Sequence, residues 1–187
     1  MQYTMSMVIG LTGRVGVGKS FVASLLVKTF DILHLDLDII GHEILLDPVV
    51  QAAVLDRFGV ADRASLGAIV FSDKKALQDL NAMMHPRMKA FVLDQLKLAA
   101  KPVVISGALL DEIGLMSVCD QIWVVDAPDN VIRERIGEKF DKIISVQRSR
   151  DAYLDEADVV FHNVPDEDVE VQVVSAFDYF VLRSKND

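Results

Sequence analysis

Residues 13–20 read Gly-Arg-Val-Gly-Val-Gly-Lys-Ser, and they follow an apolar run at Met7–Leu11. This is a complete match to Gly-x-x-x-x-Gly-Lys-Ser/Thr, placed between a predicted strand and a predicted helix as the motif requires. Its glycines allow positive φ, so that backbone N–H groups can approach phosphate oxygens. A helix that begins near Gly18 adds unpaired N–H groups and partial positive charge. The stretch therefore predicts a loop that binds the phosphates of a nucleoside triphosphate.

The side chains of this loop predict how the phosphates are held. Lys19 can reach the β- and γ-phosphates, and the Ser20 hydroxyl can ligate Mg²⁺. A glycine-rich turn without a ligand is the structural alternative, and the match of motif and context favours a binding loop. The predicted nucleotide-binding set in this segment is Gly13, Gly16, Val17, Gly18, Lys19, Ser20 and Phe21.

The whole chain alternates short β-branched and aliphatic runs with longer segments of helical spacing. Five buried strands separated by helices predict an α/β fold with a doubly wound parallel sheet. No internal repeat and no Pro-Gly linker divides the sequence, so we expect one domain over residues 1–187. The five predicted strands are Met7–Leu11, Ile32–Leu37, Val103–Ile105, Ile122–Val125 and Val159–Phe161.

About 65 residues of mostly helical pattern separate the second and third predicted strands, far more than a minimal crossover requires. We interpret residues 38–100 as a helical insertion on the substrate side. Asp47-Pro48 predicts a helix start before Val49–Phe58, because a carboxylate can cap the first turn and proline fits there. Pro86 is expected to divide one long helical stretch into two.

Charge and composition limit the classes of partner. The chain has 187 residues, of which 51% are hydrophobic and 25% charged, and its formal net charge of −9 argues against nucleic acid. Residues 133–150 nevertheless hold six basic side chains against three acidic ones. This local excess suits a compact anionic ligand, and a solvated helix face with ion pairs is the alternative.

Cysteine content and hydropathy predict the compartment. The single cysteine, Cys119, excludes an intramolecular disulfide and indicates a reducing environment. No apolar run approaches the ~18 residues that span a bilayer. We therefore expect a cytoplasmic monomer that binds no membrane.

Two carboxylates follow the second predicted strand, in Asp36-Leu37-Asp38. Side chains two residues apart in an extended segment project from one face, so both should face the crevice beyond the strand ends. One acid could hold magnesium through water, and the other could accept the proton of an acceptor hydroxyl. The alternative is that Asp38 only caps a helix at Ile39–Leu46 and Asp36 ends a strand.

Together these motifs resemble the dephospho-coenzyme A kinase family. The resemblance spans about residues 7–163, and Asp62-Arg63 with His85-Pro86 is more specific than the phosphate loop. It implies a P-loop kinase-type three-layer fold with a helical substrate-binding insertion and a short lid at residues 128–150. The matching motifs are Ile9-Gly10-Leu11-Thr12-Gly13, His34 to His42, Arg57-Phe58-Gly59, Asp62-Arg63 with Leu66, Leu80-Asn81-Ala82-Met83-Met84-His85-Pro86, and Ala157-Asp158 with Asn163.

The resemblance implies transfer of the γ-phosphoryl group of ATP to the ribose 3′-hydroxyl of dephospho-coenzyme A, the last step of coenzyme A biosynthesis. Asp38 would be the base, Asp36 a magnesium or positioning partner, and Lys19 a stabiliser of the transferred charge. Magnesium would be held by Ser20 and Asp36. The residues expected at the acceptor are Asp36, Asp38, Arg63, His85 and Arg87, with Arg135 and Lys139 in the lid and Asn163 near the adenine.

The sequence also departs from the family pattern. Arg14 and Phe21 stand where the family usually has a small residue and threonine, and Phe21 is expected to pack rather than to hydrogen-bond. Lys139 stands where the family has the second arginine of Arg-x-x-x-Arg, and lysine lacks the forked geometry of arginine. Val164-Pro165 replaces the glycine that follows Asn163 in the family.

Two alternative functions remain open on sequence grounds. The first is another small-molecule or nucleoside monophosphate kinase of the same fold, since the loop alone does not select an acceptor. The second is a nucleotide-binding homologue with weakened catalysis, or a guanine-nucleotide switch. Asp111 and Gly114 have the Asp-x-x-Gly spacing of a switch, but the sequence contains no Asn-Lys-x-Asp for guanine.

Overall fold

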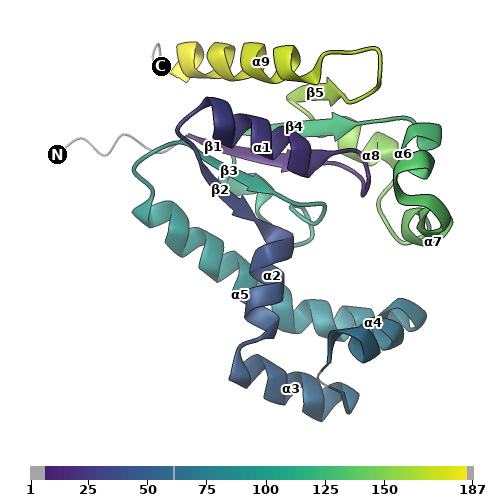
Figure 1. The fold of residues 1–187 in the computed structure, drawn as a ribbon. Helices are drawn as coiled ribbons and strands as arrows, with labels where there is room; N and C mark the ends of the chain where they lie inside the picture. Colours follow the sequence, from purple (N-terminus) through teal and green to yellow (C-terminus); the bar gives the residue numbers. More distant parts are fainter. Residues whose placement is uncertain (1–6, 61, 185–187) are drawn as a thin grey trace. The chain divides into compact units, whose positions relative to one another are not determined.

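The computed structural model describes residues 7–60 and 62–184 of the chain. Five strands form one sheet in the order β2-β3-β1-β4-β5 (Figure 1). β1 lies at its centre and pairs in parallel with β3 and β4, and β4 pairs in parallel with β5. The predicted five-stranded parallel α/β fold is confirmed, with strand ends shifted by at most one residue. The strands are β1 Val8–Thr12, β2 Leu33–Asp36, β3 Val103–Ser106, β4 Gln121–Asp126 and β5 Val159–His162.

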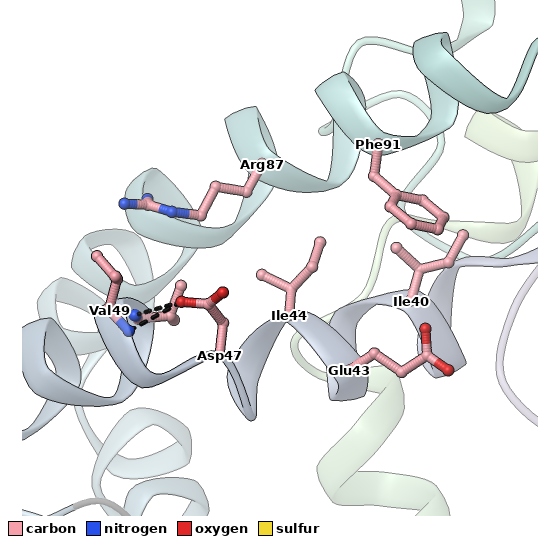
Figure 2. Close-up of a pocket in the computed structure, with 8 residues that line it drawn as sticks. Ile40, Glu43, Ile44, Asp47, Val49, Arg87 and Phe91 are labelled. Atoms are coloured by element: carbon pink, nitrogen blue, oxygen red, sulfur yellow. Dashed lines mark hydrogen bonds between the residues drawn. The ribbon is translucent and has the colours of Figure 1, made fainter.

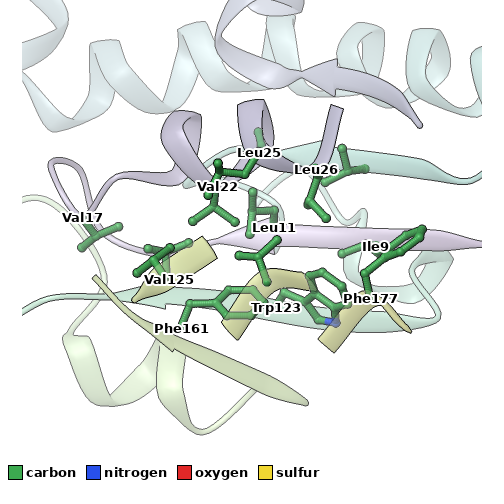
Figure 3. Close-up of a cluster of buried hydrophobic side chains, with 14 of the residues drawn as sticks. Ile9, Leu11, Val17, Val22, Leu25, Leu26, Trp123, Val125, Phe161 and Phe177 are labelled. Carbon is green, nitrogen blue, oxygen red and sulfur yellow. The ribbon is translucent and has the colours of Figure 1, made fainter. Parts of the chain in front are cut away.

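The larger part of the core lies on one face of this sheet, under α1 (Lys19–Thr29) and α9 (Val169–Ser184). Trp123 of β4 is fully buried, and its ring meets that of Phe161 edge-on at a centroid distance of 5.3 Å (Figure 3). Its indole N–H donates to the Gln121 side chain at 2.8 Å, so the buried polar atom has a partner. This packing fixes α1, and with it the end of the phosphate loop, on the sheet.

The opposite face of β4 carries a second, smaller cluster. Ile122 and Val124 alternate with Trp123 along the strand, and alternate side chains of a strand point to opposite faces. They pack with Tyr153 of α8 (Arg150–Leu154), whose hydroxyl donates to the Ala108 carbonyl at 3.1 Å. Burial raises the pKa of Tyr153 to about 12, so this side chain remains a neutral donor. The sheet is therefore covered by helices on both faces.

The segment between β4 and α8 contains short elements. The first is α6, Asp129–Ile136, followed by a 3₁₀ turn at Gly137–Lys139 and by α7, Phe140–Ile144. Another 3₁₀ turn, Met116–Val118, precedes β4. The side chain of Ile132 is fully buried and joins the larger core cluster, which ties α6 to the sheet.

The chain folds as two units: residues up to Leu35 with those from Leu98 onward, and Asp36–Lys97. The second unit is built from α2 (Leu37–Leu45), α3 (Pro48–Phe58), α4 (Arg63–Ser72) and α5 (Lys74–Leu98). Asp47 caps α3 as predicted, because its carboxylate accepts from the backbone N–H groups of Val49 and Val50. Among the described residues, no helix combines the length and the apolar character that a bilayer-spanning segment needs.

Pro86 does not divide the long helix, and the prediction of two helices is wrong. α5 runs through it without a break. Proline removes only its own backbone N–H, and buried side chains before and after it, Met84, Met88 and Val92, recur at four-residue spacing. Packing along this common stripe keeps both halves on one axis.

Candidate active site

The phosphate loop has a backbone that only glycine tolerates at three points. Gly13, Gly16 and Gly18 have φ of 137°, 84° and 102°. A Cβ on Gly13 would lie 2.3 Å from the carbonyl oxygen of Val125, at the end of the neighbouring strand β4. The loop ends at Lys19, the first residue of α1, and no side chain caps this helix. An uncapped helix start next to glycine turns is suited to bind an anion.

The side chains at the start of α1 differ in their contacts and in their exposure to solvent. The Lys19 ammonium donates to the carbonyl oxygens of Gly13 and Arg14, both at 3.0 Å, so it lies over its own loop. Ser20 is exposed to solvent. Phe21 is 51% exposed, and the expectation that it packs is wrong because this position of α1 faces away from the core.

Arg135 and Asn163 both donate hydrogen bonds to the backbone of the phosphate loop. One guanidinium nitrogen of Arg135 donates to the carbonyl oxygens of Gly16 and Val17, at 3.3 and 3.0 Å, and the other donates to that of Asn163. The Asn163 amide donates to the Val17 carbonyl at 2.7 Å. A Cβ on Gly18 would lie 2.1 Å from the same amide nitrogen. The structure thus brings these two predicted residues onto the loop.

Lys139, the second predicted lid residue, is not among these contacts. It lies in the 3₁₀ turn after α6 and is exposed. It makes no polar contact with another residue of the described part of the chain. Its ammonium is therefore available to an anionic ligand.

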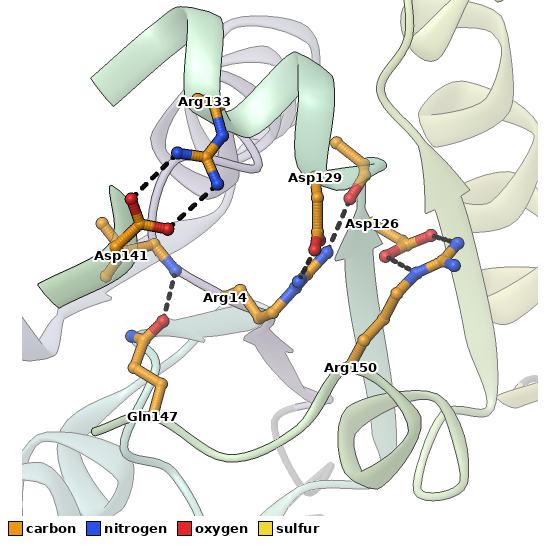
Figure 4. A network of polar contacts seen from close by, with 9 residues as sticks. Arg14, Asp126, Asp129, Arg133, Asp141, Gln147 and Arg150 are labelled. Carbon is orange, nitrogen blue, oxygen red and sulfur yellow. Dashed lines mark hydrogen bonds and ion pairs between the residues drawn. The ribbon is translucent and has the colours of Figure 1, made fainter. Parts of the chain in front are cut away.

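Two supports of the loop were not among the predicted site residues (Figure 4). The Gln147 side chain accepts from the backbone N–H of Val15 at 3.1 Å. Arg14 is buried and pairs with Asp129 at the start of α6. No local pattern marks these pairs, because the partners lie more than a hundred residues apart in the chain.

A further ion pair lies at the end of β4. Asp126 is 3% exposed, and its two carboxylate oxygens accept from the Arg150 guanidinium at 2.9 and 2.5 Å. Burial acts to raise the pKa of Asp126, but the hydrogen bonds and charge of Arg150 outweigh it and hold that pKa below its usual value. Asp126 is therefore ionised, and both of its carboxylate oxygens accept hydrogen bonds, which indicates a structural role.

In the second unit, Asp36 and Asp38 have different surroundings. One Asp36 oxygen accepts from the backbone N–H groups of Asp38 and Ile39, at 2.9 and 3.2 Å, so Asp36 is the N-cap of α2. Asp38 belongs to the first helical turn and is exposed, and no described residue makes a polar contact with its carboxylate. The prediction that the pair shares an extended segment is wrong, because α2 begins at Leu37. The alternative in which Asp38 caps the helix is wrong as well, because the cap is Asp36.

The remaining predicted acceptor residues also lie in the second unit. Arg63 is the exposed first residue of α4, directly after the cap Asp62, and His85 is half-buried in α5. Arg87 lines a pocket of about 500 Å³ between α2, α3 and α5. Figure 2 shows Phe91 pointing from α5 toward Ile40 of α2, whereas the Arg87 side chain extends along α5. The pocket lining is Ile40, Glu43, Ile44, Asp47, Val49, Val50, Arg87 and Phe91.

These walls suit an elongated, partly apolar ligand. Five of the eight lining side chains are aliphatic or aromatic, and a guanidinium and two carboxylates supply charge. Arg87 donates to the Met83 carbonyl through one nitrogen at 2.6 Å, and its other N–H groups are not used in that bond. Arg63 and His85 do not line this pocket.

Comparisons with known proteins agree on one family. Residues 7–168 match the family model described as dephospho-CoA kinase. The dephospho-CoA kinase of Vibrio parahaemolyticus is 31% identical over 202 residues, which cover 98% of each chain. That of Idiomarina loihiensis is 32% identical over 176 residues, which cover 85% of this chain and 87% of the relative.

Solved structures show the same fold. A protein from Thermus thermophilus superposes with a TM-score of 0.77 at 25% identity, over 93% of this chain and 97% of that one. The dephospho-CoA kinase from Campylobacter jejuni superposes with a TM-score of 0.69 at 21% identity, over 92% and 96%. Shikimate kinase from Aquifex aeolicus has a TM-score of 0.55 at 21% identity, over 97% and 100%.

Proposed function

Because the chain belongs to the dephospho-CoA kinase family, we propose that it transfers the γ-phosphoryl group of ATP to the ribose 3′-hydroxyl of dephospho-CoA. The observation that carries this proposal is the family match over residues 7–168, which includes both the phosphate loop and the helical unit Asp36–Lys97. A match to the loop alone would support nucleotide binding and leave the acceptor open.

The phosphate loop would hold the triphosphate through backbone N–H groups of Gly16 to Ser20. Its positive φ angles and the uncapped start of α1 support this role. Lys19 would exchange its bonds to the Gly13 and Arg14 carbonyls for phosphate oxygens. Its charge would then stabilise the negative charge that spreads over the transferred group.

Ser20 and Asp36 each offer an oxygen donor of the kind that Mg²⁺ prefers. The Ser20 side chain is exposed, and Asp36 keeps one carboxylate oxygen outside its helix cap. Mg²⁺ is bound by few protein ligands and completes its shell with phosphate and water oxygens. When bound, Mg²⁺ supplies charge neutralisation at the β- and γ-phosphates.

Asp38 is the proposed base, and Asp36 is the proposed positioning and magnesium partner. A base needs a free oxygen that can accept the proton of the attacking hydroxyl. The exposed Asp38 carboxylate meets this need, whereas one oxygen of Asp36 is engaged by two backbone N–H groups. The cap fixes Asp38 in the first turn of α2, so the loss of Asp36 would also disturb the base.

We assign residues 38–100 as the acceptor-side insertion and residues 128–150 as the lid. The pocket beside Arg87 has the apolar walls that the pantetheine arm of dephospho-CoA needs, and the guanidinium can bind a phosphate or an amide oxygen. Arg63 and His85 are assigned to further polar contacts of the acceptor. Asn163 is assigned to the nucleotide side, where its amide already holds the loop.

A substrate panel tests this proposal. Purified protein is incubated with ATP, Mg²⁺ and one acceptor at a time, and ADP release is measured with a coupled assay. The acceptors are dephospho-CoA, nucleoside monophosphates and shikimate, the last because shikimate kinase shares the fold. We expect turnover with dephospho-CoA only. Turnover with another acceptor and none with dephospho-CoA would reject the proposal.

A further inference from the structure

Arg14 is an unusual side chain to find next to a phosphate loop, because it is buried and points away from solvent. Only 5% of the residue is exposed. One terminal nitrogen donates to the Asp129 carboxylate at 2.6 Å, and the other donates to the Ala127 carbonyl at 2.8 Å. Nε has no hydrogen-bond partner among the described residues. A guanidinium so placed has lost most of its hydration, and its two bonds must compensate for that loss.

These two bonds connect the phosphate loop to the beginning of α6. Ala127 directly precedes the N-cap Pro128, and Asp129 is the first residue of the helix. Arg14 follows Gly13, the first glycine of the loop. The Arg14 side chain therefore connects the first turn of the phosphate loop to the start of α6.

The same helix contacts the loop again near its other end. Arg135 lies six residues, or about 9 Å of helix, after Asp129, and it donates to the carbonyl oxygens of Gly16 and Val17. The apolar side chains of the helix also pack on the loop. A Cβ on Gly16 would lie 2.9 Å from Ile132 and 2.9 Å from Ile136. α6 thus supports the loop at three places along its length.

We propose that Arg14 is a positioning residue for nucleotide binding: its pair with Asp129 holds α6 against the phosphate loop, so that the loop keeps its phosphate-binding shape. This inference rests on the proposed function for one point, the identity of the ligand as ATP. It concerns a residue that touches neither the proton-accepting group nor the acceptor. Arg14 acts through the loop backbone and through Arg135.

The variant Asp129→Ala tests this proposal. The Asp129 side chain is 63% exposed, but its removal leaves the buried Arg14 guanidinium without a carboxylate partner, so the folded fraction of the variant is checked by urea unfolding. Asp31→Ala is the matched control. Asp31 pairs with Lys101 at 2.7 Å, and neither residue belongs to the phosphate loop or to the lid. Arg14→Met removes the guanidinium and keeps an apolar side chain of similar length in the buried site. The double variant Arg14→Met/Asp129→Ala completes a double-mutant cycle.

The Kd of ATP is measured by isothermal titration calorimetry, and KM and kcat are measured with dephospho-CoA. We expect Asp129→Ala to raise the Kd and KM of ATP about three- to tenfold, which corresponds to the free energy of one ordinary hydrogen bond, with kcat within about twofold. Asp31→Ala should leave the Kd and KM of ATP unchanged. In the Arg14→Met background, Asp129→Ala should add no further change, because the pair is already broken.

Two results would overturn the inference: an ATP Kd for Asp129→Ala within about twofold of the parent protein, or effects of the two changes that multiply in full. The proposed function fails separately, if the parent protein binds ATP and forms no coenzyme A. In that case, the ATP Kd values of the double-mutant cycle still test the role of Arg14.

Discussion

The Asp36 carboxylate accepts a hydrogen bond from the backbone N–H of Asp38 at 2.9 Å. One acid therefore builds the helix start on which the other is carried. An Asx cap of this kind contributes about 1 kcal/mol to a helix and fixes the direction of its first turn. The two carboxylates, which look equivalent in the sequence, thus have unequal roles.

Asparagine substitutions separate these roles. Asp38→Asn should lower kcat by about 10²- to 10⁴-fold, because it removes the proton acceptor, and should leave the Kd of ATP unchanged. Asp36→Asn keeps an oxygen that can cap α2, so it should retain the helix and lose magnesium-dependent activity. Steady-state kinetics over a series of Mg²⁺ concentrations distinguishes the two. Equal and slight effects would contradict the assignment.

Gly18→Ala should abolish ATP binding and destabilise the fold by about 1–3 kcal/mol, because of its positive φ and its contact with Asn163. Gly59→Ala is the matched control, since Gly59 also has a positive φ, 72°, but a Cβ there would meet nothing within 4 Å. Urea unfolding, followed by Trp123 fluorescence, should show the larger loss for Gly18→Ala. Asn163→Ala in the Gly18→Ala background should recover part of the difference. A loss at Gly59 as large as that at Gly18 would argue against crowding by Asn163.

Arg87→Ala should raise the KM of dephospho-CoA about tenfold, through the loss of a charged hydrogen bond, with the KM of ATP unchanged. Lys97→Ala, which removes another cation of α5, is the control. Lys97 is exposed and pairs with Asp94 three residues earlier. If both variants changed the acceptor KM alike, general charge rather than the pocket would be responsible.

The Asp126–Arg150 pair predicts a pH-dependent stability. The pKa of Asp126 is lowered in the folded state, so its contribution is complete above the unfolded carboxyl pKa of about 3.9 and is lost as the pH falls through the folded value. Arg150→Met leaves a buried charge unpaired and should cost about 3 kcal/mol at pH 7. The difference from the parent protein should shrink as the pH approaches 3.

Urea unfolding at pH 7 and pH 3 checks this prediction. Arg133→Met is the control. It breaks the exposed pair with Asp141, which lowers the pKa of that carboxyl, but solvent screens this pair, so the pH-dependent loss should be much smaller. A loss for Arg150→Met that stays the same at both pH values would mean that packing, and not the charge of Asp126, causes it.

The sheet was predictable because its strands are buried on both faces and therefore read as short aliphatic runs between helices. The phosphate loop was predictable because its backbone requires glycine at fixed spacing. The Asp47 cap followed from the same local chemistry. In each case, the residues that reveal the feature are close together in the sequence, although the strands of the sheet pair across long separations.

Other features depend on contacts that are distant in sequence or on a boundary of one residue. The start of α2 at Leu37, rather than at Ile39, decides which acid is the cap. α5 continues through Pro86 because Met84, Met88 and Val92 share one buried stripe. The partners of Arg14 lie 113 and 115 residues away. Local propensity does not contain this information.

Phosphorus NMR of the reaction product tests the central claim most directly. The parent protein, ATP, Mg²⁺ and dephospho-CoA should yield ADP and one new phosphate monoester on the ribose 3′-oxygen, in equal amounts, and Asp38→Asn should yield neither at a comparable rate. Hydrolysis of ATP to inorganic phosphate without a new monoester, or a monoester formed equally fast by Asp38→Asn, would contradict the account.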